Sequence, residues 1–204
     1  MEISNPDVVT ASSGNVTVTC ERDALVAALS VVSRAVSSRG AVQVLAGVLV
    51  QAQDGLVQVA ATDMELSLRT TFAARVDGEG SLVVPGKLLV DLVRLLPDPE
   101  VTLEFRPEDG VARITSGSYS SRVNVYAAED FPRLPSVDVP LQAVDAPALL
   151  ATIDRVSRAA SRDESRPVLT GVLVRFEGNQ LVMAATDSYR LSVKETELET
   201  AGPE

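Results

Sequence analysis

A segment of this chain occurs twice, and this repeat constrains the fold more than any other feature of the sequence. A shift of 124 residues aligns residues 21–63 with residues 145–187 without a gap, and 18 of these 43 pairs are identical. The matches fall in a helical segment (ALVAALSVVSRAVS against ALLATIDRVSRAAS), an apolar strand (VLAGVLV against VLTGVLV) and the tetrapeptide AATD. Chance similarity does not keep one register through three such different blocks, so the chain contains a tandem duplication.

The first copy, residues 16–141, has an α+β pattern. Apolar residues at helical spacing predict helices over 25–36 and 88–96, and Pro97 ends the second of them. Apolar runs separated by turn residues, such as Asp54-Gly55 and Asp109-Gly110, predict antiparallel strands. One repeat therefore consists of two helices and about eight short strands, expected at 16–20, 44–50, 57–61, 66–68, 82–84, 101–105, 111–115 and 122–125.

The second copy, residues 142–204, is shorter. Asp145 is a suitable N-cap for a helix that carries Leu149, Ile153 and Val156, and a hairpin follows with its turn at Gly178-Asn179. Nothing in it corresponds to residues 81–141, so we expect a domain without its second helix and half its strands. Half a sheet leaves an unpaired edge and an uncovered apolar face. Residues 1–15 precede the first copy, and we expect them to be a disordered extension.

Absent residue types exclude several classes of function. Without histidine there is no serine–histidine triad and no imidazole metal ligand. The single cysteine, Cys20, excludes a disulfide scaffold and a thiolate zinc site, and it fits a reducing compartment. The N-terminus has no secretory pattern, and no stretch has the roughly 18 apolar residues of a membrane span. We therefore expect a cytoplasmic protein that needs no metal or other cofactor.

Charge is distributed unevenly between the predicted helices and strands. The helical segments with their following turns, 22–39, 86–96 and 145–162, hold eight basic and four acidic residues, a net charge of +4. Since the whole chain has a net charge of −10, the remainder carries −14. Charged residues on a helix commonly do no more than form its solvated face. A basic helical face on an acidic protein can also attract a polyanion locally.

The order of these elements resembles the bacterial beta sliding clamp family, the DNA polymerase III beta subunits. The resemblance is carried by VTVTCERDALVAAL, SSRGAVQVLAGVLV, LSL, VPGKLLVDLVRLLP, AAEDFPRLP and, above all, LTGVLVRFEGNQLVMAATDSYRLSV. The last segment is similar to the family's ATDGHRL motif, with Ser188 and Tyr189 in the glycine and histidine places. The similarity extends over about residues 16–198, which are one whole clamp domain and about half of a second.

This resemblance implies a non-catalytic processivity factor of DNA replication. Family members have three such domains, and two chains form a head-to-tail homodimeric ring with helices around duplex DNA and strands outside. The implied partners are double-stranded DNA, bound without sequence preference, and the alpha subunit of DNA polymerase III, clamp-loader subunits and other polymerases or repair proteins, which bind through linear motifs. The resemblance implies no membrane partner. Because ring closure joins the first domain to the third, we expect that this chain alone does not raise processivity on circular primed DNA.

The resemblance also implies two sets of site residues. Basic residues on or after the helices are the candidates for DNA contact: Arg34, Arg39, Lys87, Arg94, Arg158 and Arg162. The turn 162–166 also holds Asp163 and Glu164, whose charges oppose a contact with phosphate. The second set is the first half of a pocket for partner peptides, in which Leu169 and Leu191 form an apolar cleft flanked by polar groups: Arg166, Leu169, Thr186, Ser188, Tyr189, Arg190 and Leu191. The rest of that pocket belongs to parts of the family's chain that have no counterpart here.

Two alternatives belong to other functional classes. The duplicated Thr-Asp pair could supply two carboxylates that share a proton, as in aspartic proteases. Because Met64 and Ser188, not glycine, follow the aspartates, the sequence predicts no tight turn to present the carboxylates, and it favours a structural aspartate bonded to local backbone amides. The other alternative is a short paralogue that acts as a decoy, binding clamp ligands without encircling DNA.

Overall fold

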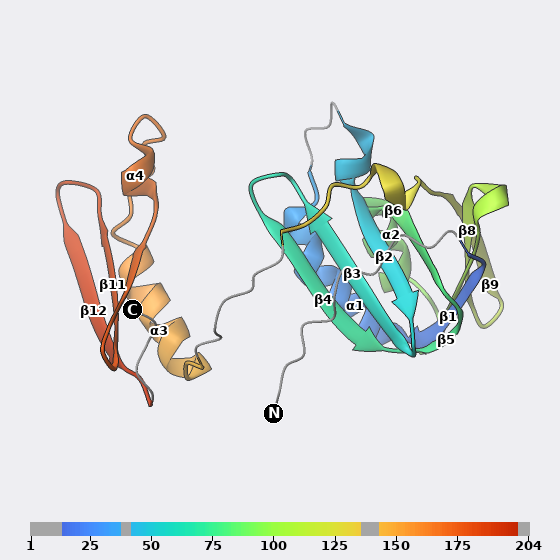
Figure 1. Ribbon diagram of the computed structural model, residues 1–204, viewed down its shortest axis with the longest axis horizontal. Coiled ribbons are helices and arrows are strands. Elements are labelled where there is room, and N and C mark those ends of the chain that lie inside the picture. Colours follow the sequence, from blue (N-terminus) through green and yellow to red (C-terminus); the bar gives the residue numbers. More distant parts are fainter. Residues whose placement is uncertain (1–13, 38–41, 136–142, 200–204) are drawn as a thin grey trace. The chain divides into compact units, whose positions relative to one another are not determined.

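The protein consists of two compact units. The computed structural model describes residues 14–37, 42–135 and 143–199, and the chain divides between Pro135 and Ser136. The described residues of the first unit form two antiparallel sheets with the helices α1 (Arg22–Val32) and α2 (Gly86–Arg94), and those of the second form one sheet with the helix α3 (Ala146–Ser157). Figure 1 shows these elements along the chain. Each unit is described here by itself.

The first unit contains a four-stranded and a five-stranded sheet. The four-stranded sheet has the order β4-β3-β2-β6, formed by Ser67–Ala73, Leu56–Thr62, Gly47–Gln53 and Gly80–Pro85. The five-stranded sheet has the order β5-β1-β7-β8-β9, formed by Arg75–Gly78, Val16–Glu21, Glu100–Arg106, Val111–Ser116 and Tyr119–Asn124. The paired strands in both sheets are antiparallel.

Helices α1 (Arg22–Val32) and α2 (Gly86–Arg94) pack against each other beside the sheets. Helix α1 buries Leu25, Leu29 and Val32, and α2 buries Leu89 and Val93, within a core to which strands of both sheets contribute. The apolar stripe of each helix therefore lies inward. Cys20 belongs to this core, and its burial raises the pKa of its thiol to about 11, so that the thiol is protonated at neutral pH.

The predicted element order is confirmed in the first unit, with local corrections. The strand expected from Val44 begins at Gly47, because Gln43–Ala46 form a 3-10 turn in which Val44 is buried. Strand β5 was not predicted: Val76 is its one large apolar residue, so four residues give no readable alternation. Helix α2 ends at Arg94, before the apolar Leu96 that the prediction included.

The second unit has one three-stranded sheet with the order β10-β11-β12, formed by Leu173–Glu177, Gln180–Thr186 and Leu191–Glu197. Helix α3 (Ala146–Ser157) packs on β11 and β12, and the short α4 (Pro167–Thr170) precedes β10. The predicted cap is confirmed, since Ala148 N donates to Asp145 Oδ2 at 2.9 Å. Strands β11 and β12 have the bounds of β3 and β4 shifted by 124 residues, so the duplication holds in three dimensions.

The two units differ in how well the repeated helix is covered. Val32 of α1 and the equivalent Val156 of α3 are both fully buried. Leu29 is 1% exposed, whereas the equivalent Ile153 is 38% exposed. Helix α2 packs against α1, and the described part of the second unit has no long helix in the corresponding place. Further large apolar side chains are exposed in that unit on α3, β10 and β12: Leu150, Leu173, Val174, Leu191 and Val193. No helix among the described residues is long and apolar enough to cross a membrane.

Candidate functional site

The repeated Thr-Asp pair forms the same turn at the end of β3 and of β11. In the first unit, Asp63 Oδ1 accepts hydrogen bonds from Glu65 N at 3.0 Å and from Leu66 N at 2.7 Å. Thr62 Oγ1 accepts from Met64 N at 3.0 Å, and Met64 has a φ of 76°. The carboxylate thereby satisfies the backbone amides of the turn that leads into the next strand.

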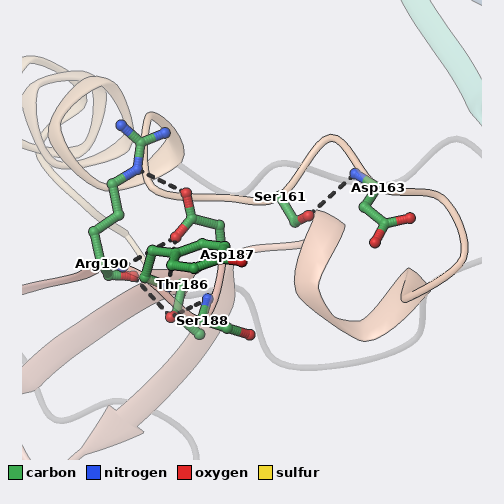
Figure 2. A network of polar contacts seen from close by, with 7 residues as sticks. Ser161, Asp163, Thr186, Asp187, Ser188 and Arg190 are labelled. Carbon is green, nitrogen blue, oxygen red and sulfur yellow. Dashed lines mark hydrogen bonds and ion pairs between the residues drawn. The ribbon is translucent and has the colours of Figure 1, made fainter.

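The second turn repeats these contacts atom by atom. Asp187 Oδ1 accepts from Tyr189 N and Arg190 N, both at 3.0 Å, and Thr186 Oγ1 accepts from Ser188 N at 3.1 Å. Ser188 has a φ of 77°, close to that of Met64. The second copy adds an ion pair, because Arg190 Nε donates to Asp187 Oδ2 at 3.0 Å (Figure 2).

These geometries correct one expectation and support another. A tight turn is present in both copies without glycine, because Met64 and Ser188 adopt the left-handed conformation. Both carboxylates accept backbone amide bonds, and those bonds hold the pKa of Asp63 and of Asp187 below the ordinary value. A proton-sharing pair needs one carboxyl whose pKa is raised. The structural role for the aspartates is therefore the better account.

A second polar cluster lies in the loop between α3 and α4. Asp163 Oδ1 accepts from Ser165 N at 3.0 Å and from Ser165 Oγ at 2.6 Å, and its Oδ2 accepts from Arg166 Nε at 2.8 Å. The hydrogen bonds from Ser165, together with the Arg166 guanidinium, lower the pKa of Asp163. Arg166 also donates from Nη1 to Ser188 Oγ at 3.2 Å, which connects the loop to the β11–β12 turn.

The loop and the turn together enclose a cleft in the second unit. Figure 2 shows the Asp187 and Arg190 pair on one side, with Ser161 and Asp163 in the loop nearby. The lining residues are Ser157, Arg158, Ala160, Ser161, Arg162, Asp163, Arg166, Asp187, Tyr189 and Arg190. Four of the ten are arginines and two are aspartates, so the cleft is polar and basic. It combines Arg158 and Arg162, expected to contact DNA, with three residues expected to bind peptide.

The peptide-pocket candidates divide into those that line this cleft and those that do not. Tyr189 lines it with 95% of its surface exposed, a large area for an aromatic side chain at the tip of a turn. Leu169 and Leu191 are not among the lining residues: Leu169 is half-buried, and Leu191 is exposed at the start of β12. Thr186 and Ser188 make hydrogen bonds at the turn. Thr186 Oγ1 donates to Arg190 O, and Ser188 Oγ accepts from Arg166 Nη1.

The DNA-contact candidates differ in their ion pairing. Arg34 lies in the 3-10 turn after α1, and Lys87 and Arg94 lie on α2; all three are exposed. Within the described parts of the chain these three have no ion pair, whereas Arg158 pairs with Asp154 at 2.9 Å. Arg39 lies outside the described residues.

A cluster of arginines on the five-stranded sheet was not predicted from the sequence. Three arginines, Arg106, Arg113 and Arg122, line a cleft over β7, β8 and β9 together with Glu104, Asp109 and Val111. Arg113 and Arg122 are directly opposite each other across the β8–β9 pair. The division into basic helices and acidic strands therefore has a local exception. Strand register was the missing information, because the three residues lie on three successive strands and their side chains meet only through the pairing of those strands.

Comparison with known proteins places both units in one family. A model described as "DNA polymerase III beta subunit, N-terminal domain" matches residues 16–135, and the model of the central domain of that subunit matches residues 143–204. The chain is 38% identical to the beta sliding clamp of Micrococcus luteus over 185 residues, which are 91% of this chain and 59% of that protein.

Solved structures agree with this result. A beta sliding clamp from Caulobacter crescentus superposes with a TM-score of 0.86 at 31% identity, covering 93% of this chain and 52% of that one. A sliding clamp from Bartonella birtlesii bound to griselimycin gives a TM-score of 0.83 at 29% identity, covering 92% of this chain and 51% of that one. The chain thus spans between half and three fifths of the length of these relatives.

Proposed function

Because the chain belongs to the DNA polymerase III beta subunit family, we propose that it forms part of a cytoplasmic, non-catalytic DNA sliding clamp that works in a homodimeric ring. Its helices contact duplex DNA, and the second unit contributes a binding site for the linear motifs of polymerases and clamp-loader subunits. The observation that carries this proposal is the repeated Thr-Asp turn, which has the same hydrogen bonds in both copies but different side chains.

The side chains of the second turn fit a peptide-binding role. Glu65 and Leu66 in the first turn are replaced by Tyr189 and Arg190 in the second, and both replacements line the cleft. An exposed tyrosine offers a rigid apolar surface, while arginine donates to main-chain carbonyls or a terminal carboxylate. Arg166 adds a second guanidinium that Asp163 and Ser188 hold in place. An extended peptide can thus make both apolar and polar contacts here.

The proposed DNA contact is supported by exposed basic side chains on α2 and in the turn after α1. Arg34, Lys87 and Arg94 are exposed and have no ion pair among the described residues, so their charges are available to phosphate. Such contacts are weak, sum over several phosphates and do not depend on base identity, as a sliding protein requires.

Griselimycin, bound by the Bartonella birtlesii relative, is the probe that tests the peptide site. We expect fluorescently labelled griselimycin to bind this chain and Tyr189→Ala to weaken binding about tenfold, because exposed aromatic anchors commonly supply 1–2 kcal/mol. Glu65→Ala, at the equivalent exposed position of the first turn, is the matched control and leaves affinity unchanged. Equal affinity of the Tyr189→Ala variant and the wild type would refute the assignment. Griselimycin binding without any DNA binding would favour the decoy instead.

A further inference from the structure

The residue at the left-handed position of the second turn makes a contact that its counterpart in the first turn does not. Met64 and Ser188 have φ values of 76° and 77°, a conformation that favours glycine. Met64 is 68% exposed, and its backbone N donates within the turn to Thr62 Oγ1. Ser188 makes the equivalent backbone bond and also accepts a side-chain bond from Arg166 Nη1 at 3.2 Å.

That side-chain bond joins two walls of the cleft. Arg166 precedes α4 and Ser188 follows β11, 22 residues later in the chain. Asp163 accepts from Arg166 Nε at 2.8 Å, so the guanidinium is held from the loop by one contact and from the turn by the other. The side chain of Arg166 is nevertheless 44% exposed, which leaves donors available to a ligand. Glycine at position 188 would suit the backbone but would have no hydroxyl for Arg166.

Building on the proposed peptide site, we propose that Ser188 is a positioning residue: its hydroxyl fixes the Arg166 guanidinium in the orientation that an extended peptide ligand uses. A long arginine side chain that is already ordered loses less conformational freedom when the ligand binds. Without the Ser188 contact, the Arg166 Nε bond to Asp163 remains, but nothing in the β11–β12 turn holds the Nη1 end of the guanidinium, so the side chain rotates more freely. Ligand binding must then order it, and the affinity falls about threefold to tenfold.

The test compares Ser188→Gly, Ser188→Ala and, as a matched control, Met64→Gly in the full 204-residue chain. Griselimycin affinity is measured by calorimetry, thermal unfolding reports stability, and ¹⁵N relaxation of the Arg166 Nε–H group reports order without ligand. Ser188→Gly and Met64→Gly both relieve a left-handed residue, so neither variant is less stable than the wild type.

The expected results separate positioning from general stability. Both Ser188 variants bind griselimycin threefold to tenfold more weakly, and their Arg166 Nε–H group is more mobile than in the wild type, while Met64→Gly changes neither quantity. Wild-type affinity and unchanged Arg166 mobility in the Ser188 variants would overturn the Ser188 proposal alone. Failure of the folded wild-type chain to bind griselimycin would overturn the peptide site, and the Ser188 proposal with it.

Discussion

Neutralising the exposed basic side chains of α2 and of the turn after α1 should make DNA binding less sensitive to salt. The variant Arg34→Gln, Lys87→Gln, Arg94→Gln neutralises three exposed side chains that have no ion pair among the described residues. Each phosphate contact on duplex DNA contributes about 0.9 to the slope of log affinity against log salt, so the variant's slope is smaller by about 2.7. Between 50 and 200 mM salt, the wild type therefore loses about 40-fold more affinity than the variant.

The assay is fluorescence anisotropy of labelled duplexes of two unrelated sequences over that salt range. A second triple variant, Arg106→Gln, Arg113→Gln, Arg122→Gln, gives the control, since it changes the net charge equally but on the sheet surface of β7–β9. The control should keep the wild-type slope. Equal loss of slope in both variants would refute the assignment of DNA contact to the helices, because the effect would then follow net charge.

Two further predictions concern stability. Leu29→Ala should destabilise the first unit by about 3 kcal/mol and Ile153→Ala the second by about 1 kcal/mol, because Leu29 is 1% exposed and Ile153 is 38% exposed. Amide hydrogen exchange, read separately for each unit, measures both changes in stability. Equal losses of stability would contradict the uncovered face of α3. The pKa of the Asp187 carboxyl is lower in the folded protein than its ordinary value of 3.8. The ionised carboxylate therefore stabilises the fold above that pH, and this stability is lost as the pH falls through the lower native pKa. Acid titration of the second unit should therefore show a shallower loss in Asp187→Asn than in the wild type, and identical curves would contradict this role.

Local patterns predicted much of the fold. The hairpin turn at Asp54-Gly55 is confirmed, with φ values of 52° and 77°, and so is the cap at Asp145. Both follow from residue types whose preferences act within a few positions. The repeat itself predicted that β11 and β12 would follow the helix α3 as β3 and β4 follow α1. Strand β5 escaped prediction, because its four residues are held by pairing with the distant β1 rather than by a pattern of their own.

Much of the candidate site depends on contacts that sequence spacing does not reveal. The bond from Arg166 to Ser188 is made by a residue in a left-handed turn, and the absence of glycine predicted that no such turn would form. Leu169 and Leu191 were expected to form an apolar cleft; neither lines the cleft between the α3–α4 loop and the β11–β12 turn, whose lining is mainly polar and charged. The pairing of Arg158 with Asp154, four residues earlier, is readable from helical spacing once the helix is assigned.

The second Thr-Asp turn, and not the first, is the proposed binding site for extended peptides. The most direct test is an amide ¹H–¹⁵N spectrum of the full chain recorded during titration with griselimycin. We expect chemical-shift changes concentrated at residues 157–171 and 186–191, with residues 62–67 unaffected. Changes of equal size at both turns, or changes confined to the first unit, would contradict it.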